Sequence, residues 1–284
     1  MLAAALSFAG MSAAVKVVAP TVPNAVVVFA RNLLSLVFVG AWIFGRGGPG
    51  LATASFKDHL VRALTGLASM YGFFYSIGHL GLAPSVLLVY SLPLYMPAIE
   101  RVWLKEPWLP KIWVPLVLGF LGILLVLRPG TDFFHGAALV ATVSGILAAV
   151  AQVGVRKLTA REPALRIVFY FALISTLVAA GPAALAWQQR PSPREAAFLL
   201  AAGFFGTVGQ VFLARAYACA PAAQVGPFLY SIVVFSGLLD ALVWGTFPDL
   251  VFFTGAALVV MAGILALRLR RLRAASPLSG PPPR

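Results

Sequence analysis

Residues 112–128, IWVPLVLGFLGILLVLR, form an apolar run that ends at an arginine. A helix needs about 20 residues, with a range of roughly 17 to 25, to cross the hydrocarbon core of a bilayer. This run is therefore long enough to span a membrane. Similar runs recur along the 284 residues, of which 61% are hydrophobic and only 10% are charged. Soluble domains carry about a quarter charged residues, so the sequence predicts an all-α integral membrane protein.

Ten such runs follow one another, separated by short segments rich in proline and glycine. We expect spans at 2–19, 25–44, 61–80, 84–104, 112–128, 136–155, 166–187, 196–214, 221–244 and 249–268. The first run has no basic segment before it, so no cleavable signal peptide is predicted. Because this run is short for a span, we expect the natural chain to start a few residues earlier.

The net charge of +13 would favour nucleic acid as a partner if the basic residues formed one patch. Instead they lie in short loops between the apolar runs, where Lys and Arg orient a chain by staying in the cytoplasm. Most of them share one side, Arg46, Arg62 and Arg101 included, whereas Arg190 and Arg194 lie on the other. We therefore predict a multi-pass protein of the cell membrane, in bacteria the inner membrane, with both termini cytoplasmic and no nucleic-acid partner.

The sequence gives little support to catalysis. Cys219 is the single cysteine, so the chain cannot form an intrachain disulfide or a thiolate metal cluster. The three histidines do not form an H-E-x-x-H zinc motif, and no nucleotide-binding loop is present. We predict no catalytic residue, no cofactor and no metal. An intramembrane enzyme and a non-transporting membrane subunit remain as alternatives to a transporter.

The two halves of the sequence resemble each other. GLAPS at 81–85 precedes the fourth span and ACAPA at 218–222 the ninth, while GILLVLR at 122–128 matches GILALR at 263–268. These matches predict one five-helix repeat in residues 1–130 and a second in residues 131–273, followed by a disordered cytoplasmic tail at 274–284. Because five is odd, the second repeat must be inverted in the membrane, an arrangement typical of secondary transporters.

Three tracts resemble a known family: VVFARNLLSL at 27–36, HLVRALTGLASMYGFFYSIGHLGLAPS at 59–85 and WLKEPWLPKIWVPLVLGFLGILLVLRPG at 103–130. They are similar to the EamA family of ten-helix permeases in the drug/metabolite transporter superfamily, and within it to bacterial permeases for S-adenosylmethionine or riboflavin. The chain has Lys105-Glu106 where that family usually has Gly-Glu. The resemblance implies a secondary transporter that moves a small polar or amphiphilic metabolite by alternating access, through a cavity lined by helices one, three, four, six, eight and nine.

Tyr71, Tyr75 and His79 recur every four residues in the third span. On a helix this spacing places three side chains on one face. They line the transport pathway, or they form packing and interfacial contacts, since tyrosines also gather at membrane boundaries. We favour the pathway because Tyr75 lies well inside the span and a buried phenol needs a polar partner.

Other polar or kinked positions lie inside the expected spans. A proline frees a backbone carbonyl one turn earlier, and such irregular backbone is tolerated beside protein or a water-filled cavity. A glutamine in hydrocarbon is either a contact between helices or a ligand contact. The remaining candidates for substrate binding are Tyr90, Pro93, Gln152, Gln210 and Tyr230.

Three charged residues also lie within or near the spans. For Arg31 we favour capping of helix-end carbonyls over binding of an anion. For Glu100 we favour a salt bridge to a loop Lys or Arg, although Glu100 and Asp240 are also candidates for carrying a coupling proton. The expected partners are a small-molecule substrate and the lipid bilayer. Coupling to a proton gradient and assembly into a homodimer are left open by the sequence.

Overall fold

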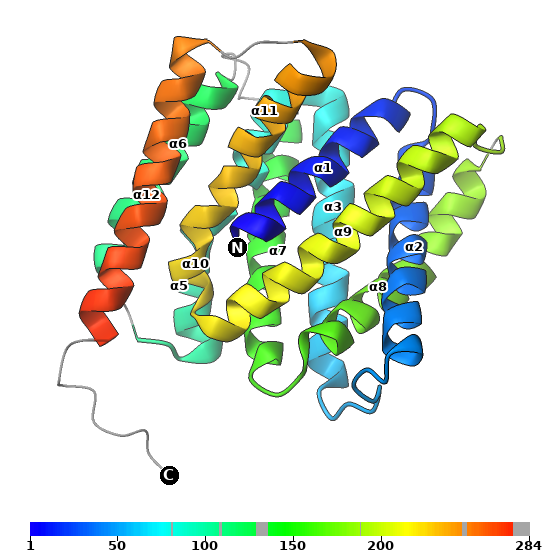
Figure 1. Ribbon diagram of the computed structural model, residues 1–284, viewed down its shortest axis with the longest axis horizontal. Helices are drawn as coiled ribbons and strands as arrows, with labels where there is room; N and C mark the ends of the chain where they lie inside the picture. The colour runs from blue at the N-terminus through cyan, green and yellow to red at the C-terminus, as the bar shows by residue number, and fades with distance from the viewer. Residues whose placement is uncertain (81, 108–109, 129–135, 188, 246–248, 275–284) are drawn as a thin grey trace.

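A computed structural model describes residues 1–284 except 81, 108–109, 129–135, 188, 246–248 and 275–284, and the described residues form helices without strands (Figure 1). The first half contains α1 (Leu2–Val18), α2 (Asn24–Gly45), α3 (Phe56–Leu80), α4 (Leu82–Val89), α5 (Leu92–Ile99), the π-helix η1 (Glu100–Leu104), the 3-10 helix η2 (Pro110–Ile112) and α6 (Trp113–Leu127). The second half contains α7 (Gly136–Thr159), α8 (Ala164–Ala186), α9 (Pro193–Cys219), α10 (Ala222–Val225), the 3-10 helix η3 (Gly226–Tyr230), α11 (Ser231–Trp244) and α12 (Leu250–Ala274).

Within the described ranges, seven helical segments are long and apolar enough to cross a membrane. They are α2, η2 with α6, α7, α8, α9, α10 with η3 and α11, and α12. The apolar helix α1 is shorter, at 17 residues, and α3 runs for 25 residues. The chain is therefore a multi-pass membrane protein. The expected fourth span is divided among α4, α5 and η1.

Prolines account for the irregular backbone of the fourth and ninth spans. Pro93 lies in the first turn of α5 and Pro97 inside it, and the π-helix η1 follows directly. Pro227 lies in the first turn of η3, between α10 and α11. A proline in a helix interior removes one hydrogen bond and clashes with the preceding turn. Both spans therefore consist of short helical pieces joined end to end.

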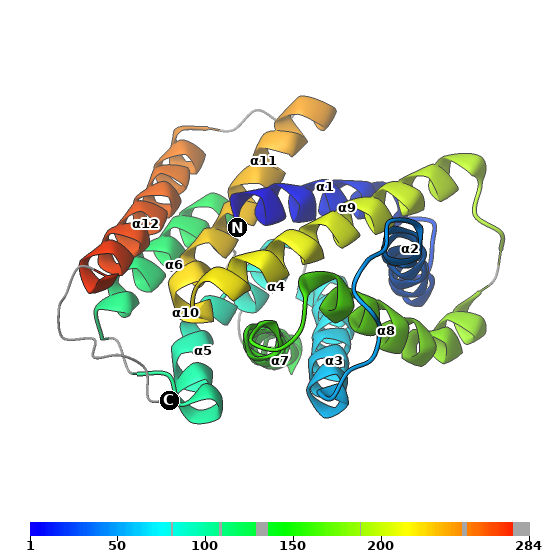
Figure 2. The same ribbon diagram turned by 60° about the horizontal axis from the view of Figure 1, so that its bottom comes forward.

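The longest helices pack in pairs from opposite halves of the chain. In Figures 1 and 2, α1 runs alongside α9 and α6 alongside α12, and the most extensive helix contacts also join α3 to α7 and α2 to α8. The α6–α12 pair occupies one edge of the molecule and the α2–α8 pair the other. Helix α9 crosses the centre, where it packs against α1, α2, α7 and α8.

Glycines set the closest approach between α6 and α12. A Cβ atom added to Gly122 would lie 2.7 Å from the carbonyl oxygen of Gly255, and one added to Gly255 would lie 2.5 Å from the carbonyl oxygen of Gly122. The two backbones are thus in direct contact. Helices in lipid associate through such small residues, because burial of apolar surface gives no driving force between them there.

Candidate functional site

Two residues on one face of α9 are contacted by arginines from two other helices. Gly206 is the middle residue of α9, and Gln210 follows one turn later. Arg31 of α2 lies against Gly206, since a Cβ atom there would be 3.1 Å from the Arg31 Nε atom. Arg62 of α3 donates a hydrogen bond from Nη2 to the Gln210 Oε1 atom at 3.0 Å. Helices α2 and α3 therefore bring two guanidinium groups to successive turns of α9.

Arg62 is buried, with a relative exposure of 3%. Its guanidinium carbon lies 3.9 Å from the centre of the Phe171 ring, in cation–π geometry. A Cβ atom on Gly66 would be 2.6 Å from the Arg62 Nη1 atom, so the missing side chain at Gly66 leaves the space that the guanidinium fills. Arg62 is thus enclosed by Phe171 of α8, Gln210 of α9 and Gly66 of its own helix.

The sequence counts Arg62 among the cytoplasmic basic residues, at the start of the third span, and the structure shows that its side chain is buried. The third helix begins at Phe56, five residues before the expected start of the span at 61. With a rise of 1.5 Å per residue, Arg62 then lies about 9 Å into α3. The expected start at 61 placed this arginine at the very end of the span, whereas it lies inside α3, and the side of the membrane on which it lies stays a prediction.

Arg31 is also buried, at 5% exposure. Its Nε atom donates to the Met11 sulfur at 3.0 Å, and its Nη1 atom donates to the Asn32 Oδ1 atom at 3.4 Å. The favoured prediction was capping of helix-end carbonyls. The hydrogen bonds that Arg31 makes to described residues go to side chains instead, and a thioether is a weak acceptor.

Two tyrosines extend this polar centre. Tyr90, in the turn before α5, interacts electrostatically with Arg31, and Tyr217 near the end of α9 does so with Arg62. The Tyr217 side chain is fully buried, and its hydroxyl has no hydrogen-bond partner among the described residues. A buried hydroxyl without a partner costs free energy. We define the central polar cluster as Arg31, Arg62, Tyr90, Gln210 and Tyr217.

The predicted residues of the third span contact residues outside this cluster. Tyr71 packs with the buried residues Val28 and Ala179, and its hydroxyl is buried without a partner among the described residues. Tyr75 is 51% exposed and stacks on His79, with 4.1 Å between the ring centres. The four-residue spacing does place these two rings on one face. Their assignment to the substrate pathway stays a prediction.

The other predicted residues lie in three places. Gln210 and Tyr90 belong to the central polar cluster. Tyr230 is fully buried among Val233 and Val259 near α12, and Pro93 packs against Gly226. The Gln152 Oε1 atom on α7 is buried without a partner among the described residues. The described contacts therefore do not join Tyr230 to Gln210.

Glu100 links the fourth span to the ninth. It is 3% exposed and accepts hydrogen bonds from the backbone N–H groups of Ala222 and Ala223, the latter at 2.9 Å. These N–H groups begin α10 and have no partner within the helix. The expected salt bridge to a loop residue is thus replaced by a cap on a helix N-terminus. The side chain of Asp240 is outside the described residues.

Further ion pairs and hydrogen bonds lie at the ends of the helices. Asp58 pairs with Lys157 at 2.8 Å between α3 and α7, and Glu162 pairs with Arg166 at 2.6 Å. Burial alone would raise the pKa of Glu162, but hydrogen bonds from Thr53 and Arg166 lower it below its usual value. Glu162 therefore remains charged at neutral pH and fixes the α2–α3 and α7–α8 loops to each other.

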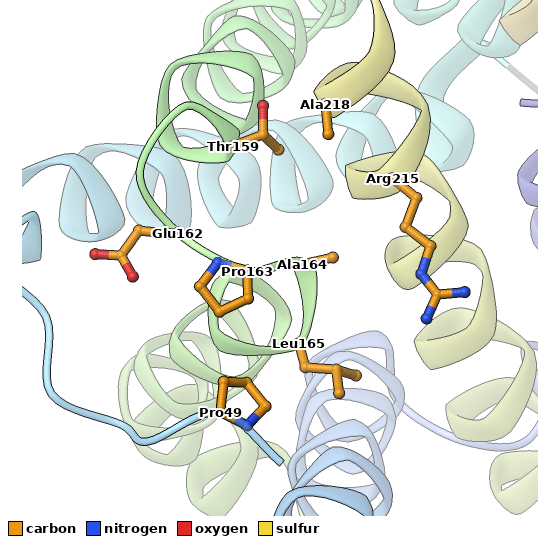
Figure 3. A pocket seen from close by; sticks show the side chains of 8 residues that line it. All are labelled: Pro49, Thr159, Glu162, Pro163, Ala164, Leu165, Arg215 and Ala218. Atoms are coloured by element: carbon orange, nitrogen blue, oxygen red, sulfur yellow. The ribbon is translucent and has the colours of Figure 1, made fainter.

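A shallow hollow of about 430 Å³ lies where the α7–α8 turn meets the end of α9 (Figure 3). It is lined by Pro49, Thr159, Glu162, Pro163, Ala164, Leu165, Arg215 and Ala218. Figure 3 shows the Glu162 carboxylate pointing away from the other lining residues. The hollow is open and mostly apolar, whereas the buried polar groups lie in the central polar cluster. We therefore take the cluster as the candidate site.

The sequence matches the model of the EamA-like transporter family twice, over residues 1–128 and 135–268. The chain belongs to the EamA-like transporter family. It is 31% identical to the pseudopaline exporter CntI of Pseudomonas aeruginosa over 272 residues, which cover 94% of each protein. It is 25% identical to an S-adenosylmethionine uptake transporter of Rickettsia felis, covering 85% of this chain and 82% of that protein. A riboflavin transporter of Vibrio cholerae is also 25% identical, covering 84% and 81% respectively.

The EamA assignment made from the sequence is thereby confirmed, as is the similarity to transporters named for S-adenosylmethionine and riboflavin. This EamA protein is a membrane transporter rather than an enzyme. A solved structure titled "Crystal structure of protein" has the same fold, with a TM-score of 0.80, 17% identity and coverage of 96% of this chain and 99% of that one. At this identity the likeness supports the fold alone.

Sequence reasoning missed Arg62, Tyr217, Met11 and Phe171 as neighbours of the candidate site. The signal for Arg62 was present, because a basic residue within a turn or two of a helix start can lie inside the bilayer. Nothing in the sequence pattern indicates Met11 or Phe171, since both are apolar residues in apolar helices. In the described part of the chain, no three His, Cys, Asp or Glu side chains gather as metal ligands would.

Proposed function

We propose that this EamA protein moves a small polar or amphiphilic metabolite by alternating access, with residues 1–130 and 131–273 as two inverted five-helix repeats. The substrate binds at the central polar cluster, where α9 is at mid-length and thus near the bilayer midplane. Transporters with inverted repeats hold their substrates at this depth, at the interface of the repeats. The relatives named for pseudopaline, S-adenosylmethionine and riboflavin support a small metabolite as the cargo.

The observation that carries this proposal is the pattern of helix packing. An in-plane two-fold axis exchanges the first span with the sixth and the third with the eighth. It therefore turns the α1–α9 contact into the α7–α3 contact, and these are two of the most extensive contacts in the molecule. The same axis maps the α2–α8 and α6–α12 pairs onto themselves. This pattern supports ten spans in two related five-helix halves, and an odd number of spans in each half makes the second half inverted.

Two helix-end contacts support the same symmetry. Asp58 is the third residue of α3 and binds Lys157 near the end of α7. Glu195 is the third residue of α9 and accepts a hydrogen bond from Thr21, just after α1. Each acidic side chain thus ties the third span of one half to the end of the first span of the other. In the proposed orientation, the two contacts lie on opposite sides of the membrane.

The proposed orientation has both termini in the cytoplasm. In a Cys219→Ser background, we expect a membrane-impermeant maleimide to label Gln189→Cys in intact cells but not Ala160→Cys. Both positions are exposed, one in the α8–α9 loop and the other after α7. Labelling of Ala160→Cys after the cells are permeabilised is the control for its accessibility. The reverse pattern in intact cells would contradict the orientation.

Transport in proteoliposomes tests the proposed function directly. We expect proteoliposomes that contain the protein to accumulate a labelled metabolite from a screened panel. The same assay with a pH gradient across the membrane tests proton coupling. Tyr75→Phe keeps the ring that stacks on His79 and removes the hydroxyl. If Tyr75 lines the pathway, transport falls by several-fold, since one net hydrogen bond contributes about 1 kcal/mol.

Tyr170→Phe is the matched control for Tyr75→Phe. The Tyr170 hydroxyl donates to the Leu51 carbonyl oxygen at 2.8 Å, in the α2–α3 loop, so its loss is expected to leave transport per folded molecule unchanged. Unchanged transport by both Tyr75→Phe and His79→Ala would assign that stacked pair to packing. No transport of any compound by the wild-type protein would contradict the proposed function itself.

A further inference from the structure

The charges of Arg31 and Arg62 are not balanced by any described carboxylate. The ion pairs in the described residues involve Arg128, Arg156, Lys157, Arg166 and His59, which lie at or near helix ends. Arg31 and Arg62 instead make hydrogen bonds to Met11, Asn32 and Gln210, which are all uncharged. A guanidinium has five N–H donors. The Arg62 Nε atom is buried without an acceptor among the described residues.

Two such cations are costly in the interior of a membrane protein. Taking an ion out of water carries a large penalty, which is offset only by a partner of opposite charge and by hydrogen bonds. The two guanidiniums also repel each other, since each lies within electrostatic range of the other. Folding alone therefore gives no reason for two arginines in this place. Intramembrane charges of this kind are usually functional.

The geometry brings both cations to one spot. Arg31 contacts α9 at Gly206, and Arg62 contacts it at Gln210. These positions are four residues apart on the same face, which is about 6 Å along the helix. A small group between them can therefore meet both guanidiniums. The Phe171 ring and Met11 add apolar surface beside it, and the buried Tyr217 hydroxyl adds a polar group without a described partner.

We infer that Arg31 and Arg62 bind a carboxylate group of the transported metabolite. This inference rests on the proposed transport function and names the class of its substrate. The guanidinium fork matches the two coplanar oxygens of a carboxylate. One bound carboxylate would supply the missing negative charge and accept hydrogen bonds from donors that the protein leaves without acceptors. The aromatic and thioether surface then contacts the rest of the substrate.

The position of the cluster favours a carboxylate over a phosphate. Phosphate sites commonly add backbone N–H groups from a helix N-terminus or a glycine-rich loop. Arg31, Arg62 and Gln210 all lie in helix interiors, where the backbone N–H groups are used within the helix. The N–H donors available to an anion here thus belong to side chains. Two guanidinium groups match the two oxygens of a carboxylate.

The test is anion-dependent stabilisation of the purified full chain in detergent. A ligand that binds only the folded protein stabilises it, and at this size about 1 kcal/mol shifts the melting temperature by roughly 2–4 °C. We expect millimolar carboxylates, with succinate, glutamate and citrate as probes, to raise the melting temperature by a few degrees. Succinamide, which keeps the shape of succinate without its charges, should give no shift.

Arg31→Met and Arg62→Met should each abolish the stabilisation by carboxylates. Arg161→Met, at an exposed loop arginine, is the matched control and should respond as the wild type does. Without added anion, Arg31→Met should melt no lower than the wild type, because it removes one of two repelling buried charges. A purely structural role for Arg31 would instead lower the melting temperature without anion.

Four results would overturn the inference. The first is no shift of the melting temperature with any carboxylate, and the second is a shift in the two arginine variants equal to that of the wild type. The third is a melting temperature of Arg31→Met, without anion, well below that of the wild type. The fourth is a larger shift with inorganic phosphate than with the carboxylates. Failure of the proposed function appears differently. Carboxylate binding without transport of any compound would leave the site intact and contradict transport, whereas transport that is unaffected by both variants would contradict only the carboxylate site.

Discussion

Glu100→Ala is expected to lower the melting temperature of the detergent-solubilised protein by roughly 6–12 °C, the effect of about 3 kcal/mol at this chain length. The Glu100 carboxylate accepts the N–H groups of Ala222 and Ala223 at the buried start of α10. Alanine would leave both groups without a partner in a place that water does not reach. The change is measured as the fraction of monodisperse protein that remains after heating to a series of temperatures.

Two control variants separate the cap from the charge. Glu100→Gln keeps one carbonyl oxygen as an acceptor, so its loss of stability should be intermediate. Glu106→Gln removes a partly exposed carboxylate that lies 3.7 Å from Arg156, and surface pairs of this kind contribute at most about 1 kcal/mol. If Glu100→Ala melts like Glu106→Gln, the capping role is wrong. Proton-driven transport that persists in Glu100→Gln would exclude Glu100 as a proton carrier.

The spans and their breaks were largely predictable because they depend on local sequence. Apolar length fixes where a helix can cross a bilayer, and the prolines at 93 and 227 fix where two helices are interrupted. The α8 helix, for example, covers Ala164–Ala186, close to the expected 166–187. The third helix is the exception. Its polar first turns carry Lys57, Asp58 and His59, which hide a helical segment from an argument based on hydrophobicity.

The candidate site was only partly predictable, because its contacts join residues far apart in the chain. Gln210 could be recognised as an uncharged polar residue in an apolar helix. Its partner Arg62 lies 148 residues away, and no local pattern connects the two. Periodicity did place Tyr75 and His79 on one face of α3. It could not show what that face meets, because this depends on how α3 packs against other helices.

The assignment of Glu100 illustrates the same limit. An acidic residue near a basic loop favours an ion pair when only the sequence is known. The structure offers it two N–H groups of α10 instead, from a segment 122 residues further along the chain. A carboxylate interacts well with a helix N-terminus, because the first N–H groups have no partner and the helix dipole is positive there.

Gly255→Val is expected to destabilise the protein strongly at the contact between α6 and α12. A Cβ atom at Gly255 would lie 2.5 Å from the Gly122 carbonyl oxygen and 2.8 Å from a methyl group of Val126. A backbone atom cannot turn aside as a side chain can, so the two helices must separate. Overpacking costs typically about 1–3 kcal/mol, and the lost backbone contact adds to it. We expect a markedly lower melting temperature and a lower yield of folded protein.

Gly181→Val in α8 is the matched control, because no atom lies within 4 Å of a Cβ added there. Both substitutions place the same β-branched side chain in a helix, so their intrinsic helix propensities cancel. An equal loss of stability in the two variants would contradict a specific α6–α12 contact. The arginines of the central polar cluster contact α1, α8 and α9 rather than this edge of the molecule. The folded fraction of Gly255→Val should therefore still be stabilised by carboxylates, which would separate the site that binds substrate from the contact that holds the fold.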